Sequence, residues 1–225
     1  LESVQGDAAL QFLRLAQEAL ANVVRHSGAN RVVLTCCHVK AQQALMLEVA
    51  DNGVGMDKDD LVKNLGTIAH SGTRELLKNL GDGQKKDINL IGQFGVGFYS
   101  AFMVADRVDV ISHRAGTNEA WQWSSDGKGT YTVAPADAAA APARGTRVVL
   151  HLMEDAKSYT ERFSIERIVR ANSGHVPVPI AIIEKPGAEP TEVADGAALW
   201  TRPRTEIKPE EYTDFYRSVA GQFDE

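Results

Sequence analysis

The residues with the clearest chemical potential form the run Asp51-Asn52-Gly53-Val54-Gly55-Met56. A carboxylate at the end of a strand can accept a hydrogen bond from the exocyclic amine of a purine. The two glycines lack side chains, so the backbone can pass close to a flat ligand. This D-x-G-x-G pattern is weak alone, because Asp-Asn-Gly is also an ordinary turn signal. The run therefore predicts a purine contact only where other motifs support it.

Two further motifs flank this run. The first contains Glu18 and Asn22, four positions apart, which would share one face of a helix predicted over residues 8–26. The second is glycine-rich and would present backbone N–H groups to phosphate at the start of a helix. A Walker-type site is excluded, because no G-x-x-x-x-G-K-[ST] loop is present. The glycine-rich motif consists of Gly92, Gln93, Phe94, Gly95, Val96, Gly97 and Phe98.

The elements around these motifs predict a single sheet with helices. Alternating apolar residues over 44–50 predict the strand that ends at Asp51, and residues 31–37 predict its hairpin partner. The glycine-punctuated segment 66–97 is expected to act as a mobile lid. The pattern as a whole favours an α/β fold, a two-layer α+β sandwich. Helices are expected over 57–64, 98–104 and 164–171, and further strands over 107–112, 120–124, 131–133, 146–152 and 176–183.

Composition limits the possible partners. The 225 residues suit one large domain, or one domain with a fragment of another. A net charge of −6 gives no electrostatic footprint for nucleic acid or an anionic membrane. Neither a signal peptide nor an apolar run of membrane-spanning length is visible, which predicts a cytoplasmic location. The adjacent Cys36 and Cys37 would point to opposite faces of a strand, which favours free thiols in a reducing compartment.

In this order, the three motifs resemble the ATP-binding superfamily of 90-kDa heat-shock chaperones, sensor histidine kinases, type II topoisomerases and MutL-type repair proteins. From Asp51 onward the chain is most similar to bacterial 90-kDa heat-shock chaperones. The runs that carry this resemblance are residues 64–69, 71–73, 91–102 and 144–146.

The resemblance also predicts a domain organisation. Residues 199–202 and 210–216 resemble the start of the chaperones' middle domain. We therefore expect an ATP-binding domain over residues 1–184, and a linker with a truncated start of the middle domain over 185–225. Within the first domain, residues 15–29 resemble a sensor histidine kinase. This predicts a chimera, kinase-like over 1–50 and chaperone-like over 51–184, with a divergent natural chaperone as the alternative.

The resemblance implies a role for each site residue. ATP or ADP would bind with Mg²⁺, which Asn22 would hold through its amide oxygen, a suitable hard ligand. Glu18 would be the general base for hydrolysis. Asp51 would bind the adenine amine, supported by Thr146. Two more pocket residues would be Gly55 and Asn64, while Met56 would either pack on the base or belong to the core.

The leading expectation is an ATP/Mg²⁺-binding domain with weak ATPase activity, which assists folding of client proteins in the full-length parent. The alternatives are a nucleotide-binding module without turnover and a sensor-kinase catalytic domain. Hydrolysis would be weak because His70 replaces a lid lysine and the chaperones' catalytic arginine would lie beyond Glu225. We also expect a mainly monomeric protein, without the segments that dimerise these chaperones.

Overall fold

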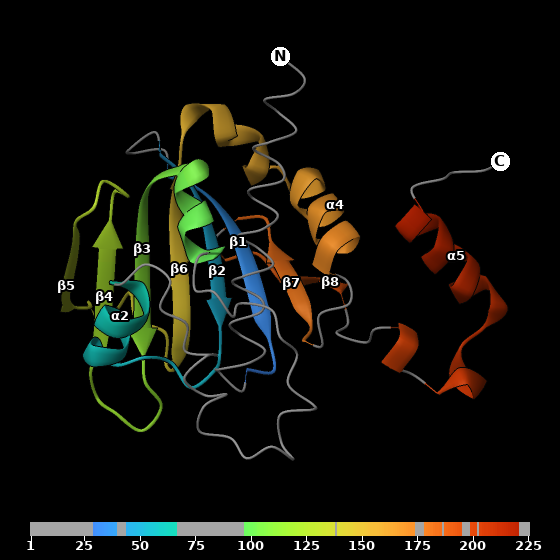
Figure 1. Ribbon diagram of the computed structural model, residues 1–225, viewed down its shortest axis with the longest axis horizontal. Helices are drawn as coiled ribbons and strands as arrows, with labels where there is room; N and C mark the ends of the chain where they lie inside the picture. The colour runs from blue at the N-terminus through green and yellow to red at the C-terminus, as the bar shows by residue number, and fades with distance from the viewer. Residues whose placement is uncertain are drawn as a thin grey trace.

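The computed structural model describes residues 29–39, 44–66, 97–137, 139–173, 178–185, 187–194, 199–201 and 203–220. Within these residues, eight strands form one mixed sheet in the order β5-β4-β3-β6-β2-β1-β7-β8 (Figure 1). The strands are β1 (Val32–Val39), β2 (Ala44–Asp51), β3 (Ala105–His113), β4 (Ala120–Ser125), β5 (Tyr131–Pro135), β6 (Gly145–Leu152), β7 (Ile180–Ile183) and β8 (Thr191–Ala194).

Within the described part of the chain, three α-helices and four 3₁₀-helices accompany the sheet. The α-helices are α2 (Lys58–Leu65), α4 (Arg162–Ser173) and α5 (Pro209–Ala220). The 3₁₀-helices are η3 (Gly97–Met103), η4 (Glu154–Thr160), η5 (Leu199–Thr201) and η6 (Arg204–Glu206). No described helix is both long and apolar enough to cross a bilayer.

The predicted hairpin is present at the centre of the sheet. Antiparallel pairing joins β1 to β2 along their full length, from Val32 opposite Asp51 to Val39 opposite Ala44. On its other side, β2 pairs antiparallel with β6, while β1 pairs in parallel with β7. Asp51 therefore lies at the end of a strand that has a paired neighbour on each side.

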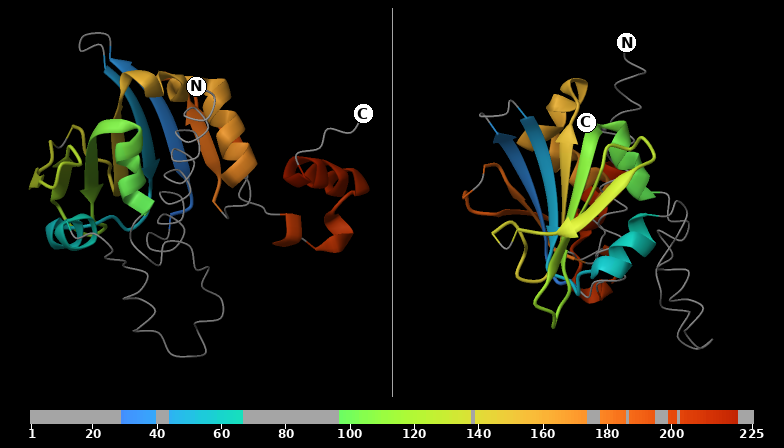
Figure 2. Two further views of the ribbon diagram at one scale, coloured as in Figure 1. Left: turned by 45° about the horizontal axis from the view of Figure 1, so that its top comes forward. Right: turned by 90° about the vertical axis from the view of Figure 1, so that its left-hand side faces the viewer.

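The described helices α2, η3 and α4 gather on one face of the sheet (Figures 1 and 2). Strand alternation sends buried side chains such as Leu34, Leu47 and Leu150 to this face. There they form one core with Leu61 of α2 and Ile165 of α4, so the fold has one sheet layer and one helical layer. This confirms the predicted α/β two-layer sandwich.

Several elements differ from the sequence-based expectations. The helix expected over residues 98–104 is present as a 3₁₀-helix over Gly97–Met103. An edge strand that was not predicted, β8, pairs with β7. The predicted domain boundary at residue 184 therefore falls between two paired strands of the sheet. In Figure 1, α5 lies to one side of the sheet. The helix predicted over 8–26 lies outside the described residues.

Candidate functional site

Asp51 is the best-defined chemical group of the site. It ends β2, and its carboxylate Oδ1 accepts the backbone N–H of Gly53 at 2.7 Å. The backbone N–H of Thr146, at the start of β6, also donates to this carboxylate. Burial raises the pKa of Asp51, while the two N–H groups limit the rise. The result is a largely buried acceptor that two fixed donors orient.

Gly55 allows two parts of the backbone to approach closely. Its φ is +70°, and a Cβ atom there would lie 2.1 Å from the carbonyl oxygen of His113. The neighbouring Val54 carbonyl accepts the N–H of Ala115 at 2.7 Å. Glycine is therefore needed at position 55 so that the Asp51 loop can pack on the end of β3, a role that the motif did not suggest. Its predicted role in leaving room for a ligand stays a prediction.

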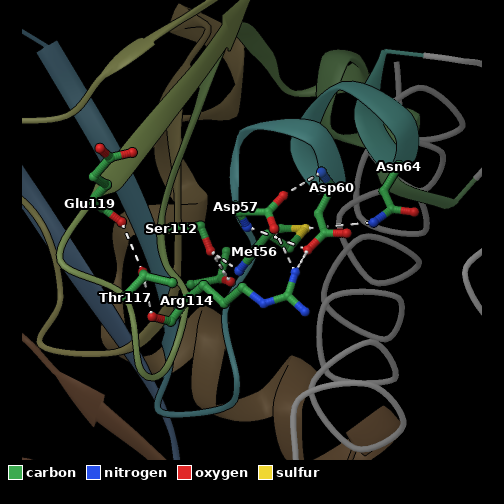
Figure 3. A network of polar contacts seen from close by, with 9 residues as sticks. Met56, Asp57, Asp60, Asn64, Ser112, Arg114, Thr117 and Glu119 are labelled. Atoms are coloured by element: carbon green, nitrogen blue, oxygen red, sulfur yellow. Dashed lines mark hydrogen bonds and ion pairs between the residues drawn. The ribbon is translucent and has the colours of Figure 1, made fainter.

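Met56 and Asn64 are brought together by the turn into α2. The Met56 N–H donates to Ser112 Oγ at 2.8 Å, and its Sδ lies 4.0 Å from Asn64 Nδ2 (Figure 3). Both side chains are half-buried, and Met56 packs against the hydrophobic core. Part of Met56 therefore serves the core, which is one of the two roles expected for it.

A pair of acidic residues fixes the start of α2. Asp57 caps the helix by accepting the N–H of Asp60 at 2.9 Å, and the Asp60 carboxylate accepts the N–H of Asp57 in return. Arg114, just beyond β3, donates to both carboxylates at 2.6 Å (Figure 3). The Asp60 N–H and the Arg114 guanidinium lower the pKa of Asp57. This contact holds α2, and with it Asn64, against the end of β3.

The end of the glycine-rich motif is attached to α2. The helix η3 begins at Gly97, as the motif predicted, and Tyr99 in its first turn donates to the carbonyl of Leu65 at 3.0 Å. Phe98 is half-buried and packs edge-to-face on Tyr99 and Trp123, with ring centroids 5.7 and 5.6 Å apart. Its ring is therefore part of an aromatic cluster beside α2.

Ser112 links the separate parts of the site, and sequence reasoning missed it. This side chain on β3 has no exposed surface. Its hydroxyl accepts from Met56 N–H, donates to the Gly145 carbonyl at 3.1 Å and lies 2.9 Å from Thr146 Oγ1. The available signal was strand alternation, since Ser112 follows Val108 and Val110 on the inward face.

Part of the predicted site can thus be placed. Asp51 and Thr146 are in direct contact, and Met56, Gly55 and Asn64 join them through the loop and α2. The predicted general base, the predicted metal ligand and five residues of the glycine-rich motif lie outside the described residues, namely Glu18, Asn22, Gly92, Gln93, Phe94, Gly95 and Val96. Among the residues that are described, no three His, Cys, Asp or Glu side chains could share a metal ion.

Comparison with protein families gives an independent result. Residues 14–160 match the family described as histidine kinase-, DNA gyrase B- and HSP90-like ATPase. The matched range includes the candidate site from Asp51 to Thr146. It also covers most of the segment 1–50 together with the residues that follow it.

Three curated relatives are each named Chaperone protein HtpG. The chain is 67% identical to the one from Mesorhizobium japonicum over 179 residues, 80% of this chain and 28% of the relative. It is 68% identical to that of Nitrobacter winogradskyi over 180 residues, with coverages of 80% and 28%. For Rhizobium meliloti, the identity is 61% over 198 residues, with coverages of 88% and 31%. The chain spans less than a third of each relative's length.

These matches give no support to a kinase-like origin for residues 1–50. The Rhizobium meliloti match covers 88% of the chain, which exceeds the share that residues 51–225 make up, so it extends into residues 1–50. The family match likewise passes through residue 50 from residue 14. The chain belongs to the family of histidine kinase-, DNA gyrase B- and HSP90-like ATPases.

Proposed function

We propose that this chain is the ATP-binding domain of a chaperone of the HtpG type, and that it binds ATP or ADP with Mg²⁺ and hydrolyses ATP slowly. The observation that carries this proposal is the oriented carboxylate of Asp51. A half-buried acceptor with two fixed N–H donors suits recognition of an amine on a flat ligand, in a family of ATPases. The HtpG relatives favour a chaperone over the sensor-kinase alternative.

Within the proposed site, Asp51 accepts a hydrogen bond from the adenine amine. The base lies against the half-buried side chains of Met56 and Asn64, with Thr146 at its edge. Support for this placement comes from the hydrogen bonds that connect these residues across β2, β3, β6 and α2.

Phosphate and metal would be held by segments outside the described residues. Asn22 would ligate Mg²⁺, and Mg²⁺ bound there would neutralise charge on the transferring phosphate. Glu18 would orient the attacking water as general base. The phosphates would meet N–H groups of the glycine-rich motif that ends at Gly97 and Phe98. The start of η3 at Gly97 is the described feature that agrees with this arrangement.

Binding is tested by calorimetry with ADP and Mg²⁺ on the whole chain. The wild-type protein is expected to bind ADP. Asp51→Asn should weaken binding by roughly 10- to 100-fold, as expected for loss of a hydrogen bond to a charged partner. Asp59→Asn is the control, because this exposed carboxylate lies on α2 near the site. A wild-type chain that binds no adenine nucleotide would overturn the proposal.

Hydrolysis is tested separately by phosphate release. Glu18→Ala should retain ADP affinity and lose turnover, because a general base contributes about 10²–10⁴-fold to the rate. If wild type and Glu18→Ala release phosphate equally slowly while both bind ATP, the chain is a nucleotide-binding module without turnover. His70→Lys tests the lid position and is expected to raise the rate.

The chaperone role is inferred from relatives of which this chain spans less than a third, and it needs a different experiment. We propose that residues 1–184 together with the paired strand β8 form the nucleotide domain, and that the residues after β8 lead into a middle domain, in a cytoplasmic protein that binds client proteins. The chain itself is proposed to be mainly monomeric, which light scattering with and without ATP analogue would test. Replacing the corresponding part of the Mesorhizobium japonicum relative with this chain should preserve that relative's ability to prevent client aggregation.

A further inference from the structure

We propose that Ser112 is a positioning residue that fixes the direction of the Thr146 hydroxyl proton, and thereby makes the site select a 6-amino purine over a 6-oxo purine. The inference rests on the proposed function, in which Asp51 and Thr146 face the base. Ser112 itself has no exposed surface, so a ligand cannot touch it. Any effect on ligand choice must therefore pass through its neighbours.

The surroundings of Ser112 define three polar contacts. Met56 N–H donates to Ser112 Oγ at 2.8 Å (Figure 3). Ser112 Oγ lies 3.1 Å from the Gly145 carbonyl oxygen and 2.9 Å from Thr146 Oγ1. Ser112 and Thr146 stand opposite each other in the β3–β6 pairing, which holds the two hydroxyls in contact.

The number of protons decides how these contacts are arranged. A serine hydroxyl has one proton to donate and two lone pairs. The Gly145 carbonyl can only accept, so the Ser112 proton goes to it. One Ser112 lone pair receives Met56 N–H, and the other is left for the proton of Thr146. If Ser112 instead donated its proton to Thr146, no proton would lie between Ser112 Oγ and the Gly145 carbonyl oxygen, which are 3.1 Å apart. Two unbridged oxygen acceptors at this distance are costly in a buried site.

This arrangement determines what Thr146 offers a ligand. With its proton directed to Ser112, Thr146 Oγ1 presents only lone pairs to the half-buried side of the residue. Asp51 is an acceptor when ionised, and the Thr146 N–H is already committed to it. The neighbouring groups are therefore both acceptors. They match an amine, which has protons to donate, and leave the carbonyl oxygen of a 6-oxo purine without a partner.

The experiment compares ADP with IDP, which carries oxygen in place of the 6-amino group, because neither requires turnover. Calorimetry with Mg²⁺ on the full chain gives the ratio of the two affinities. Wild type is expected to prefer ADP, and Ser112→Ala should lower the preference by roughly tenfold, since it frees the Thr146 proton to donate to the carbonyl oxygen. Ser112→Thr keeps a hydroxyl and should therefore show the wild-type preference for ADP over IDP. The control is Ser125→Ala, whose hydroxyl bonds the Thr130 carbonyl away from the site.

A double-mutant cycle identifies the route of the effect. Thr146→Val has nearly the same shape but no hydroxyl, so Ser112→Ala should change the ratio no further in that background. Circular dichroism establishes that each variant is folded. If Ser112→Ala does not fold, Ser112→Cys replaces it, and its weaker hydrogen bonding should give an intermediate ratio.

The outcomes separate this inference from the proposed function. A lower ratio in Ser112→Ala that Ser112→Thr restores supports it. Equal weakening of ADP and IDP would show that Ser112 is merely structural and would overturn it, as would an unchanged ratio in a folded variant. In both cases ADP binding by wild type leaves the proposed function in place. A wild-type chain that binds neither nucleotide overturns both.

Discussion

A Cβ atom at Gly145 would lie 2.2 Å from the carbonyl oxygen of Asp51. The first residue of β6 thus packs directly on the last residue of β2, and its φ of +99° turns the chain there. This approach brings the N–H of Thr146 onto the Asp51 carboxylate. Only glycine has both the conformational freedom and the small size that the contact needs.

Gly145→Ala is expected to destabilise the protein by more than about 2 kcal/mol, because a strained φ and a backbone clash coincide. The control is Gly129→Ala, since Gly129 has a φ of +96° with nothing within 4 Å of an added Cβ. It should show the conformational cost alone, about 1–2 kcal/mol. Urea unfolding measures both variants. If Gly145→Ala and Gly129→Ala lower the free energy of unfolding equally, the close approach of residue 145 to Asp51 carries no cost.

Asp51→Asn should separate stability from binding. Burial raises the pKa of Asp51 above 3.8, so its ionised form is unfavourable in the folded protein without ligand. The neutral amide is therefore expected to leave the free energy of unfolding at pH 7 unchanged or higher, while nucleotide affinity falls. Thermal unfolding without nucleotide checks the first part. A clearly less stable ligand-free variant would contradict it.

The same raised pKa predicts a pH dependence of binding. As pH falls through the raised pKa of Asp51, the carboxyl takes up a proton and becomes a poorer acceptor. The affinity of wild type for ADP should then approach that of Asp51→Asn, which has no titrating group at this position. Calorimetry between pH 7.5 and mildly acidic pH gives the ratio of the ADP affinities of wild type and Asp51→Asn at each pH. A ratio that stays constant would argue against Asp51 as the amine acceptor.

Asp109 should protect the fold against acid. Burial alone would raise its pKa, but hydrogen bonds from His151, Ser124 and Arg107 outweigh this and lower the pKa to about 2. His151 Nε2 lies 2.7 Å from its carboxylate. Because the folded-state pKa is below 3.8, the stabilisation is present above pH 3.8 and is lost as pH falls from there toward about 2.

At pH 7, Asp109→Asn should therefore lower the free energy of unfolding by about 2 kcal/mol. Asp106→Asn is the control, because Asp106 lies on the same strand with an exposed side chain. Urea unfolding at pH 7 and pH 3 gives the free energy of unfolding of wild type and Asp109→Asn. The difference between the two proteins should be smaller at pH 3 than at pH 7. A difference that does not depend on pH would remove ionisation of Asp109 as its cause.

Arg114 should matter more for binding than for stability. Its ion pairs with Asp57 and Asp60 are partly exposed, with about two-fifths of each side chain accessible, so each contributes at most about 1 kcal/mol. Arg114→Gln should nevertheless weaken ADP binding several-fold, because it loosens the attachment of α2 and Asn64 to β3. High salt should reduce the difference from wild type.

The matched variant is Arg162→Gln. Arg162 also pairs with two carboxylates, Glu166 and Glu184, and its side chain is about as exposed as that of Arg114. It lies on α4, apart from the Asp51 loop. A similar change in stability without a change in ADP affinity is expected. If both variants weaken ADP binding equally, the contribution of Arg114 is general stability rather than placement of α2.

The sequence by itself determined much of the architecture. Apolar alternation defined the hairpin of β1 and β2 and placed Asp51 at the end of a strand, because side chains alternate between the faces of a strand. Local signals also placed α2 and the start of the helix at Gly97. These features depend on neighbours in the chain, whose spacing a sequence displays directly.

Only the tertiary structure decided which partners complete the site. Ser112, Arg114 and Gly145 contribute through contacts with residues far away in the chain. Ser112 and Arg114 stand in no recognisable motif, and the run that contains Gly145 does not show that this glycine packs on Asp51. The register between β3 and β6 puts Ser112 opposite Thr146, and that register follows from packing of the whole sheet. A hydrogen bond between strands needs both backbones in place, so spacing along one segment cannot reveal it.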